Sequence, residues 1–269
     1  MDWSRIKTIF IICFLMLDIY LIYEFFKIQD SNQVEVQTQT EASFEKSLKD
    51  DKIEYGTLRN DHLEDYYLKA KPKVFTTEDI QNTIFSDQTT NIISGNTLES
   101  FLNEPFTVKN RSDSIELNNF LKNDVLYGDQ YNFWEKDTEG HSITYYQQYD
   151  GKTLFENLNG KLTFYLNEDN EVISYQQTYL EEIGELSSKS EKLIQPIKAL
   201  ETLYTNDVLQ PKSKIEVELG YYTLVPLMDT TQVLNPAWRF IINDKESLYV
   251  SAFEGKIIEL KSEKKKVVE

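Results

Sequence analysis

The chain has 269 residues, with 28 Lys and Arg against 45 Asp and Glu, and a formal net charge of -17. Binding to nucleic acid requires clustered basic side chains, and the body of the chain has no such cluster, so we exclude a nucleic-acid partner. Apolar residues make up 40 % of the chain and aromatic residues 13 %, enough to build a packed core. The only cysteine, Cys13, lies in an N-terminal apolar stretch, which leaves the rest of the chain without disulfides or thiolate metal sites.

The N-terminal stretch from Thr8 to Phe26 predicts a transmembrane helix in contact with membrane lipid. At about 1.5 Å per residue it spans roughly 28 Å, close to the thickness of the hydrocarbon core of a bilayer. No small-residue cleavage site follows it, so we expect an uncleaved signal anchor. Arg5 and Lys7 precede the stretch and a polar, acidic segment follows it. The positive-inside rule then predicts a single-pass protein of the cell membrane, with a cytoplasmic N-terminus and an extracytoplasmic body.

Asp18 lies near the middle of this stretch, where an ionised carboxylate facing lipid costs roughly 2.5–3.5 kcal/mol. One interpretation is that Asp18 contacts a partner helix, together with Phe14, Leu21 and Phe25 on the same helix face. The alternative is that Asp18 is protonated or drawn toward the outer interface of the membrane. Both interpretations stay open.

The chain divides into segments of different composition. Residues 1–7 form the predicted cytoplasmic end, residues 8–26 the transmembrane helix and residues 27–42 a polar stalk. We expect a first exported α+β domain over 43–186, a second over 187–262 and a charged tail over 263–269. The first domain begins with a predicted helix over 44–52 and strands over 53–58 and 66–71.

Two stretches of the exported body share one order of predicted elements. In the first, Asp113 caps a helix with Leu117 and Leu121 on its apolar face. Strands follow at 131–136, 142–149, 161–167 and 172–179, and turn sequences such as Asp150-Gly151 separate them.

The second stretch opens with a capping box of Ser188 and Glu191, which predicts the start of another amphipathic helix. Pro196 within this pattern indicates a later start or a kink. Strands follow at 215–225, 237–242, 248–252 and 256–260.

Each predicted antiparallel sheet needs a cover for its apolar face, and the preceding helix has a suitable apolar stripe. The predicted fold class is therefore α+β: one N-terminal transmembrane helix followed by an exported body of repeated helix-plus-antiparallel-sheet units. The second helix-plus-sheet repeat contains Pro236-Ala237-Trp238-Arg239 and Gly255-Lys256-Ile257. It resembles the PepSY module, a non-catalytic fold of secreted inhibitors and regulators.

Residues that could carry catalysis are scarce. The only histidines, His62 and His141, form no metal-ligand pattern, and the chain has no nucleophile elbow, phosphate-binding loop or kinase signature. We therefore predict no enzyme activity, no catalytic, cofactor-binding or metal site, and no small-molecule substrate. Protein binding fits the supply of aromatic side chains better, which includes Tyr145, Tyr146, Tyr149, Phe164 and Tyr165. Strand alternation assigns half of these residues to the core.

The opening residues from Met1 to Ile11 are similar to the start of YycI proteins, in which a very short cytoplasmic end runs directly into one membrane helix. The segment from Tyr67 to Pro72 and the Pro-Ala-Trp-Arg stretch also resemble this family, so the resemblance covers essentially the whole chain. It implies an exported architecture like that of YycH, a partnership with YycH, and joint modulation of the sensor kinase WalK. WalK and its response regulator WalR control cell-wall metabolism, and the resemblance leaves the sign of the effect on the kinase undefined.

Two other functions stay open at this point. A membrane-tethered cell-wall enzyme would need two or three convergent polar groups in a deep pocket. A PepSY-like protease inhibitor would place its interface on the last unit alone.

Overall fold

A computed structural model of the chain describes residues 7, 11–22, 42–56, 58, 63–81, 87–108, 115–223 and 231–259. The chain divides into two compact units, the first of residues 1–54 and 210–213 and the second of residues 55–209 and 214–269. Apart from residues 7 and 42, the predicted cytoplasmic end, stalk and charged tail lie outside the described residues, as does Phe25.

The first unit contains two described helices, over residues 11–22 and 42–50. The helix over 11–22 covers the central part of the predicted transmembrane segment, whose remainder lies outside the described residues. Within the ranges that the structure describes, no helix has both the length and the apolar composition needed to cross a membrane. The helix over 42–50 buries Phe44 and Leu48, which confirms the prediction of a helix here.

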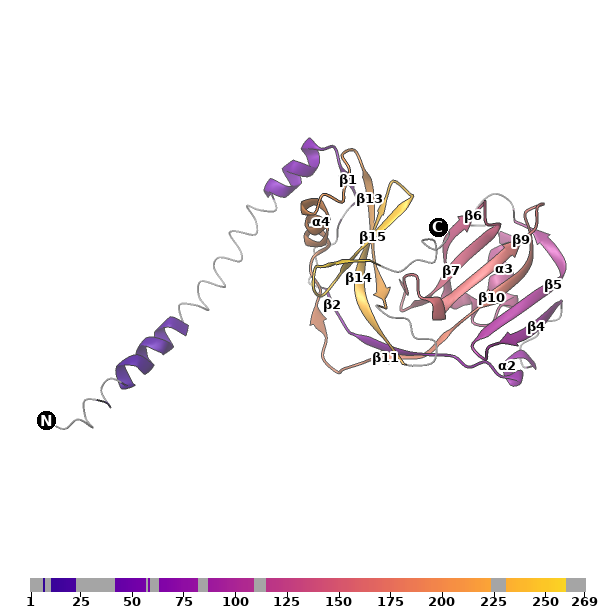
Figure 1. Ribbon diagram of the computed structural model, residues 1–269, viewed down its shortest axis with the longest axis horizontal. Coiled ribbons are helices and arrows are strands. Elements are labelled where there is room, and N and C mark those ends of the chain that lie inside the picture. Colours follow the sequence, from indigo (N-terminus) through magenta and orange to yellow (C-terminus); the bar gives the residue numbers. More distant parts are fainter. Residues whose placement is uncertain are drawn as a thin grey trace, which may run out of the picture. The chain divides into compact units, whose positions relative to one another are not determined.

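The second unit is built around two antiparallel sheets, hereafter the first and the second sheet (Figure 1). The first sheet has the order β4-β5-β10-β9-β7-β6, and β8 pairs with β7. Its strands are β4 (Gln88–Ile93), β5 (Thr97–Thr107), β6 (Tyr131–Asp137), β7 (Ser142–Tyr149), β8 (Lys152–Thr153), β9 (Lys161–Leu166) and β10 (Glu171–Gln177).

The second sheet has the order β1-β13-β14-β15-β16, while β3 pairs with both β14 and β11. Its strands are β1 (Glu54–Tyr55), β3 (Leu68–Pro72), β11 (Leu180–Glu185), β13 (Lys214–Tyr222), β14 (Gln232–Ile242), β15 (Glu246–Ser251) and β16 (Ile257–Ile258). A separate two-stranded ladder joins β2 (Glu64–Asp65) and β12 (Glu191–Lys192). The helices are α2 (Thr77–Gln81), α3 (Ile115–Asp124) and α4 (Pro196–Thr205), with short 3-10 turns at η1 (Gly128–Gln130) and η2 (Leu158–Gly160).

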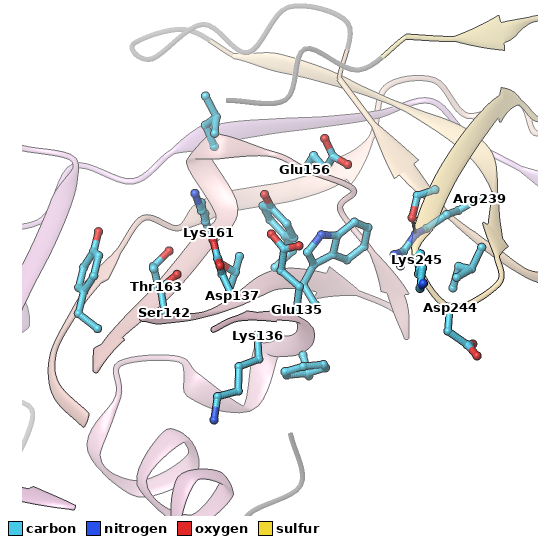
Figure 2. A pocket seen from close by; sticks show the side chains of 18 residues that line it. Glu135, Lys136, Asp137, Ser142, Glu156, Lys161, Thr163, Arg239, Asp244 and Lys245 are labelled. Atoms are coloured by element: carbon cyan, nitrogen blue, oxygen red, sulfur yellow. Dashed lines mark hydrogen bonds between the residues drawn. The ribbon is translucent and has the colours of Figure 1, made fainter. Parts of the chain in front are cut away.

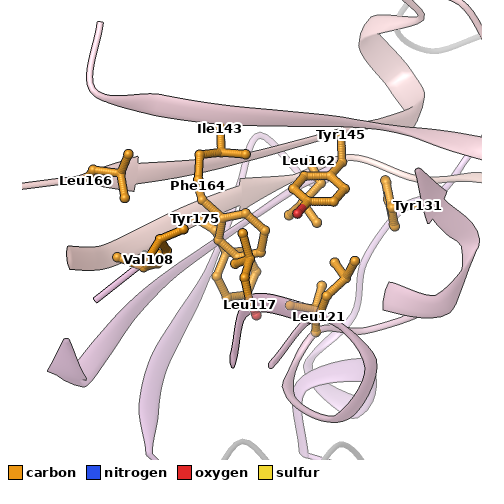
Figure 3. Packing of buried hydrophobic residues seen from close by; sticks show 12 residues of the cluster. Val108, Leu117, Leu121, Tyr131, Ile143, Tyr145, Leu162, Phe164, Leu166 and Tyr175 are labelled. Carbon is orange, nitrogen blue, oxygen red and sulfur yellow. The ribbon is translucent and has the colours of Figure 1, made fainter. Parts of the chain in front are cut away.

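Helix α3 covers one face of the first sheet. Leu117 and Leu121 of α3 point toward the sheet and pack against alternate residues of its strands (Figure 3). Aromatic rings meet there edge to face, since the Phe164 centroid lies 5.7 Å from those of both Tyr145 and Tyr175. The core of the sheet is therefore on the α3 side. The residues that alternate with these core residues along each strand point to the other face.

Helix α4 lies against the second sheet, with Ile197, Leu200 and Leu203 buried. Pro196 is its first residue, as the fixed φ of proline favours at a helix start. The predicted capping box at Ser188 is wrong, because Glu191 belongs to strand β12 and pairs with Asp65 instead of beginning a helix. The later start indicated by Pro196 is confirmed.

The predicted repeat of one helix and four strands is present. In the second unit, α3 precedes β6, β7, β9 and β10, and α4 precedes β13, β14, β15 and β16, each set pairing in chain order. The α+β fold class is thus confirmed. The proposed domain boundary near residue 187 stays a prediction, and β3 and β11, which precede it, pair in the second sheet.

A buried polar cluster ties three distant segments together beside the second sheet. Asp65, only 5 % exposed, accepts hydrogen bonds from Lys152 Nζ at 2.6 Å and from the Tyr221 hydroxyl at 2.8 Å. These residues belong to β2, β8 and β13. A buried carboxylate requires such partners, so the cluster holds β2 and β8 against β13.

Candidate functional site

A cleft of about 740 Å³ lies between the faces of the two sheets that carry no helix. Figure 2 shows side chains of the first sheet, such as Ser142, Thr163 and Glu135, opposite Arg239 and Lys245 of the second. Both walls belong to the second unit of the chain.

The wall on the first sheet is formed by residues that alternate with its core residues. Thr144 and Thr163 face each other across β7 and β9, and Ser142 pairs with Tyr165 in the same way. Because Tyr145 and Phe164 point to the α3 side, their neighbours Thr144 and Thr163 point into the cleft. The centre of this wall therefore consists of short hydroxyl side chains.

A β-bulge in β6 shapes part of the same wall. The register of β6 against β7 shifts between Phe133 and Glu135, so Trp134 is the extra residue. Phe133 packs against Tyr145 on the α3 side, whereas Trp134 lies edge-on to Tyr146, with centroids 5.1 Å apart, on the cleft side. The bulge thus brings a large aromatic ring into the space between the sheets.

The wall on the second sheet comes from β14, β15 and the hairpin that joins them. Trp238 of β14 points toward α4, since its indole Nε1 donates to the carbonyl of Ile194 just before that helix at 3.0 Å. By strand alternation the next residue, Arg239, points into the cleft. The same wall also contains Ile241, Asp244, Lys245 and Ser247.

Arg239 links the two walls. Its guanidinium carbon lies 3.5 Å from the centroid of the Trp134 ring. The same group donates to Glu218 Oε1 at 2.6 Å and to Ser247 Oγ at 2.9 Å. Two hydrogen bonds fix the planar cation over the indole, a geometry that favours a cation–π contact.

A row of aromatic rings leads from Trp134 in the cleft to β15 of the second sheet. Trp134 contacts Phe155 at 6.1 Å, and Phe155 contacts Tyr249 of β15 at 5.6 Å between centroids. The Tyr249 hydroxyl donates to Glu156 Oε1 at 2.7 Å. Burial raises the pKa of Tyr249 well above its ordinary value, and the charge of the Glu156 carboxylate raises it further. This tyrosine is therefore a neutral hydrogen-bond donor at physiological pH.

The charges of the cleft are balanced, in contrast to the chain as a whole. Its lining includes four acidic residues (Glu135, Asp137, Glu156 and Asp244) and four basic ones (Lys136, Lys161, Arg239 and Lys245). In Figure 2 the Lys136 side chain leads away from the others. No His or Cys is among the described lining residues. The arrangement suits binding through hydroxyls and paired charges, and it offers neither an imidazole base nor a thiol nucleophile.

The residues predicted to contact a partner in the membrane lie elsewhere. Phe14, Asp18 and Leu21 are on the helix over 11–22 and are exposed, with the spacing that places them on one helix face. Nothing in the described structure tests their role. The aromatic residues singled out from the sequence separate as alternation predicts: Tyr145 and Phe164 are in the core, and Tyr146 and Tyr165 line the cleft.

The comparisons with known proteins identify the family. A family model for the YycI protein matches residues 31–253. The chain belongs to the YycI family. The matched range includes β1 to β15 and so covers both walls of the cleft. No curated protein matches the sequence.

The solved structures that resemble the chain include two with named proteins. The C-terminal domain of YpeB from Bacillus megaterium aligns with a TM-score of 0.36 and 12 % identity, over 83 % of this chain and 97 % of that chain. YycH from Bacillus subtilis aligns with a TM-score of 0.40 and 15 % identity, over 74 % of this chain and 54 % of that chain. The chain thus spans about half the length of YycH.

Proposed function

We propose that this protein is a membrane-anchored, extracytoplasmic regulator that acts with YycH on the sensor kinase WalK, and through WalK and WalR on cell-wall metabolism. The observation that carries the proposal is membership of the YycI family over residues 31–253. The protein would bias the kinase toward one of its conformations through contacts that differ between them.

The N-terminal segment supports anchoring in the cell membrane. Thr8 to Phe26 is mostly apolar, and Arg5 and Lys7 precede it on the side that would remain in the cytoplasm. The described part of this segment exposes its large apolar side chains, among them Ile11, Met16 and Ile22. Contiguous exposed apolar surface is typical of segments that contact lipid or another protein.

Within this segment, Asp18 would face a helix of the partner, flanked by Phe14 and Leu21 on the same face. A carboxylate in the membrane is costly when it faces lipid, and a polar partner offsets that cost. The exported body would then supply the contacts with YycH.

A regulatory rather than catalytic role also fits the chemistry of the described residues. In the ranges that the structure covers, no three His, Cys, Asp or Glu side chains come together as a metal site would require. The fixed polar groups of the cleft, Arg239 and Glu156, already bind Glu218 and Tyr249. We therefore favour a binding function for this body.

Co-purification from native membranes tests the proposal. We would tag the full-length protein, a version lacking residues 1–27, and the Asp18→Leu variant, and identify partners by mass spectrometry. We expect YycH and WalK with the full-length protein, loss of WalK without the anchor, and less WalK with Asp18→Leu, because the leucine cannot bond to a polar partner.

Tyr20→Leu is the matched control, since Tyr20 lies on a different face of the same helix. It should leave WalK recovery unchanged. If neither YycH nor WalK accompanies the full-length protein, the proposed function is wrong. If Asp18→Leu and Tyr20→Leu behave alike, the role assigned to Asp18 is wrong and the regulatory proposal stands on the anchor deletion alone.

A further inference from the structure

The cleft is hollow because of a particular distribution of side-chain sizes. Ser142, Thr144 and Thr163, all short, occupy adjacent positions on β7 and β9. Tyr165 lies on one side of them and Tyr146 on the other, paired with Ser142 and Lys161 respectively. A floor of small hydroxyl residues between aromatic rings leaves room that longer side chains would fill.

The ring of Tyr165 is held in place by a chain of hydrogen bonds. Its hydroxyl donates to Gln176 Oε1 at 3.1 Å, and Gln176 Nε2 donates to Glu99 Oε1 at 2.9 Å. These residues continue the same polar face of the first sheet through β10 and β5. An aromatic side chain fixed in this way can contact a ligand without a further loss of rotamer freedom.

The lining narrows the chemical class of ligand. The aliphatic residues of the lining are Leu158 and Ile241, too few for an acyl chain, and its other apolar surface comes from aromatic rings. Basic and acidic residues are equal in number, so a polyanion gains no net attraction. The walls are faces of sheets whose backbone groups already pair within the sheets, so an extended peptide cannot add a strand there.

We propose that the cleft binds a neutral oligosaccharide, a short length of glycan chain. Sugar hydroxyls can donate to carboxylates and accept from lysine, and they can do both with Ser142, Thr144 and Thr163. The apolar C–H face of a sugar ring packs against an aromatic face, the role assigned to Tyr165. The volume of about 740 Å³ lies within the range of ligand sites, roughly 300–1,000 Å³.

Calorimetric titration of the full-length protein tests this directly. The probes are a soluble chito-oligosaccharide and a cello-oligosaccharide of equal length, which differ in the acetamido group. We expect saturable binding of at least one of them. Tyr165→Ala should weaken it about tenfold by removing the ring contact. Tyr165→Phe keeps the ring and should bind nearly as well as the unaltered protein.

Two further variants separate a cleft effect from a general one. Thr163→Val removes a hydroxyl from the floor at nearly constant size and should also weaken binding. Thr89→Val changes the same face of the first sheet outside the cleft lining and should have no effect. Circular dichroism of each variant would establish that it is folded.

Three outcomes would overturn the inference. The first is that the folded protein binds neither oligosaccharide. The second is that Tyr165→Ala binds as tightly as the unaltered protein, and the third is that an uncharged Ser-, Thr- and Gly-rich peptide competes with the sugar on equal terms. None of these results bears on recovery of YycH or WalK, so failure here is distinguishable from failure of the proposed function.

Discussion

The two sheets of the exported body follow one plan but are completed by different parts of the chain. Each begins with a helix followed by four strands that pair in order, α3 with β6 to β10 and α4 with β13 to β16. The first sheet is extended by β4 and β5, a hairpin that directly precedes α3 in the chain. The second is extended by β3 and β11, which lie far from β14 in sequence.

The two sheets therefore differ in the length of the loops that their pairing closes. Pairing β5 with β10 closes a loop over residues 107–171, whereas pairing β3 with β14 closes one over residues 70–232, which is longer and costs more chain entropy. Side-chain contacts must offset that cost. The cluster of Asp65, Lys152 and Tyr221 adds such contacts beside the second sheet, because it connects three segments that are distant in sequence.

The largest expected effect comes from removing the carboxylate of this cluster. Asp65→Ala leaves Lys152 and the Tyr221 hydroxyl without their buried partner. Loss of one partner from a buried ion pair costs about 3–5 kcal/mol. We therefore expect the free energy of unfolding of the full chain to fall by this order, measured by urea denaturation with circular dichroism.

Glu216→Ala is the matched control for this prediction. Glu216 pairs with Lys214 at 3.1 Å on β13, and both side chains are more than half exposed. An exposed pair contributes little, so the midpoint of denaturation should hardly move. Equal effects of Asp65→Ala and Glu216→Ala would contradict the special dependence of the second sheet on distant contacts.

The strands of both repeats could be predicted because their signals are local. Alternation marks β7 and β9, and Asp150-Gly151 forms the turn between β7 and β8 with φ angles of 50° and 71°. Such left-handed backbone is what Asp-Gly tolerates and most residue pairs do not. Where a signal of this kind exists, the predicted and observed bounds agree within a few residues.

Strand β11 and the cleft, which both depend on distant partners, escaped prediction, whereas β3 corresponds to the strand predicted over 66–71. Strand β11 contains three glutamates and a glycine, which carry no strand signal, and it forms because β3 supplies its pairing partner. The cleft was missed for the same reason. Trp134 and Arg239 meet only through the tertiary fold, and neither lies in a motif that indicates the other.

The next effect in size concerns the packing of Phe155 against the second sheet. A Cβ at Gly220 of β13 would lie 2.4 Å from both the Phe155 ring and the carbonyl oxygen of Thr153. Gly220→Ala should therefore destabilise the protein by about 1–3 kcal/mol through overpacking. Thermal unfolding would measure this against Gly184→Ala, where nothing lies within 4 Å of the added carbon. A Gly220→Ala protein as stable as Gly184→Ala would show that this close approach is unimportant.

A smaller effect measures the link between the two sheets. The stacking of Arg239 on Trp134 should appear as a coupling free energy of about 0.5–2 kcal/mol. We would measure it in a double-mutant cycle of Arg239→Ala and Trp134→Leu, using free energies of unfolding. The cycle is needed because Arg239 also binds Glu218. Additive single effects would mean that the contact does not hold the sheets together.

The smallest effect is on the pH dependence of the free energy of unfolding. It is confined to alkaline pH and is expected to be the same in both sheets. Burial raises the pKa of Tyr131 in the first sheet and of Tyr249 in the second well above the ordinary value of 10.0. The unfolded chain then loses these protons first, so the stability that they contribute is complete below pH 10 and declines as the pH rises toward the folded pKa. Tyr131→Phe and Tyr249→Phe should each reduce the alkaline slope by at most about 1.4 kcal/mol per pH unit, measured by denaturation across alkaline pH. An unchanged slope in only one variant would reveal that one sheet opens to solvent before the other, since an exposed tyrosine titrates alike in the folded and unfolded states.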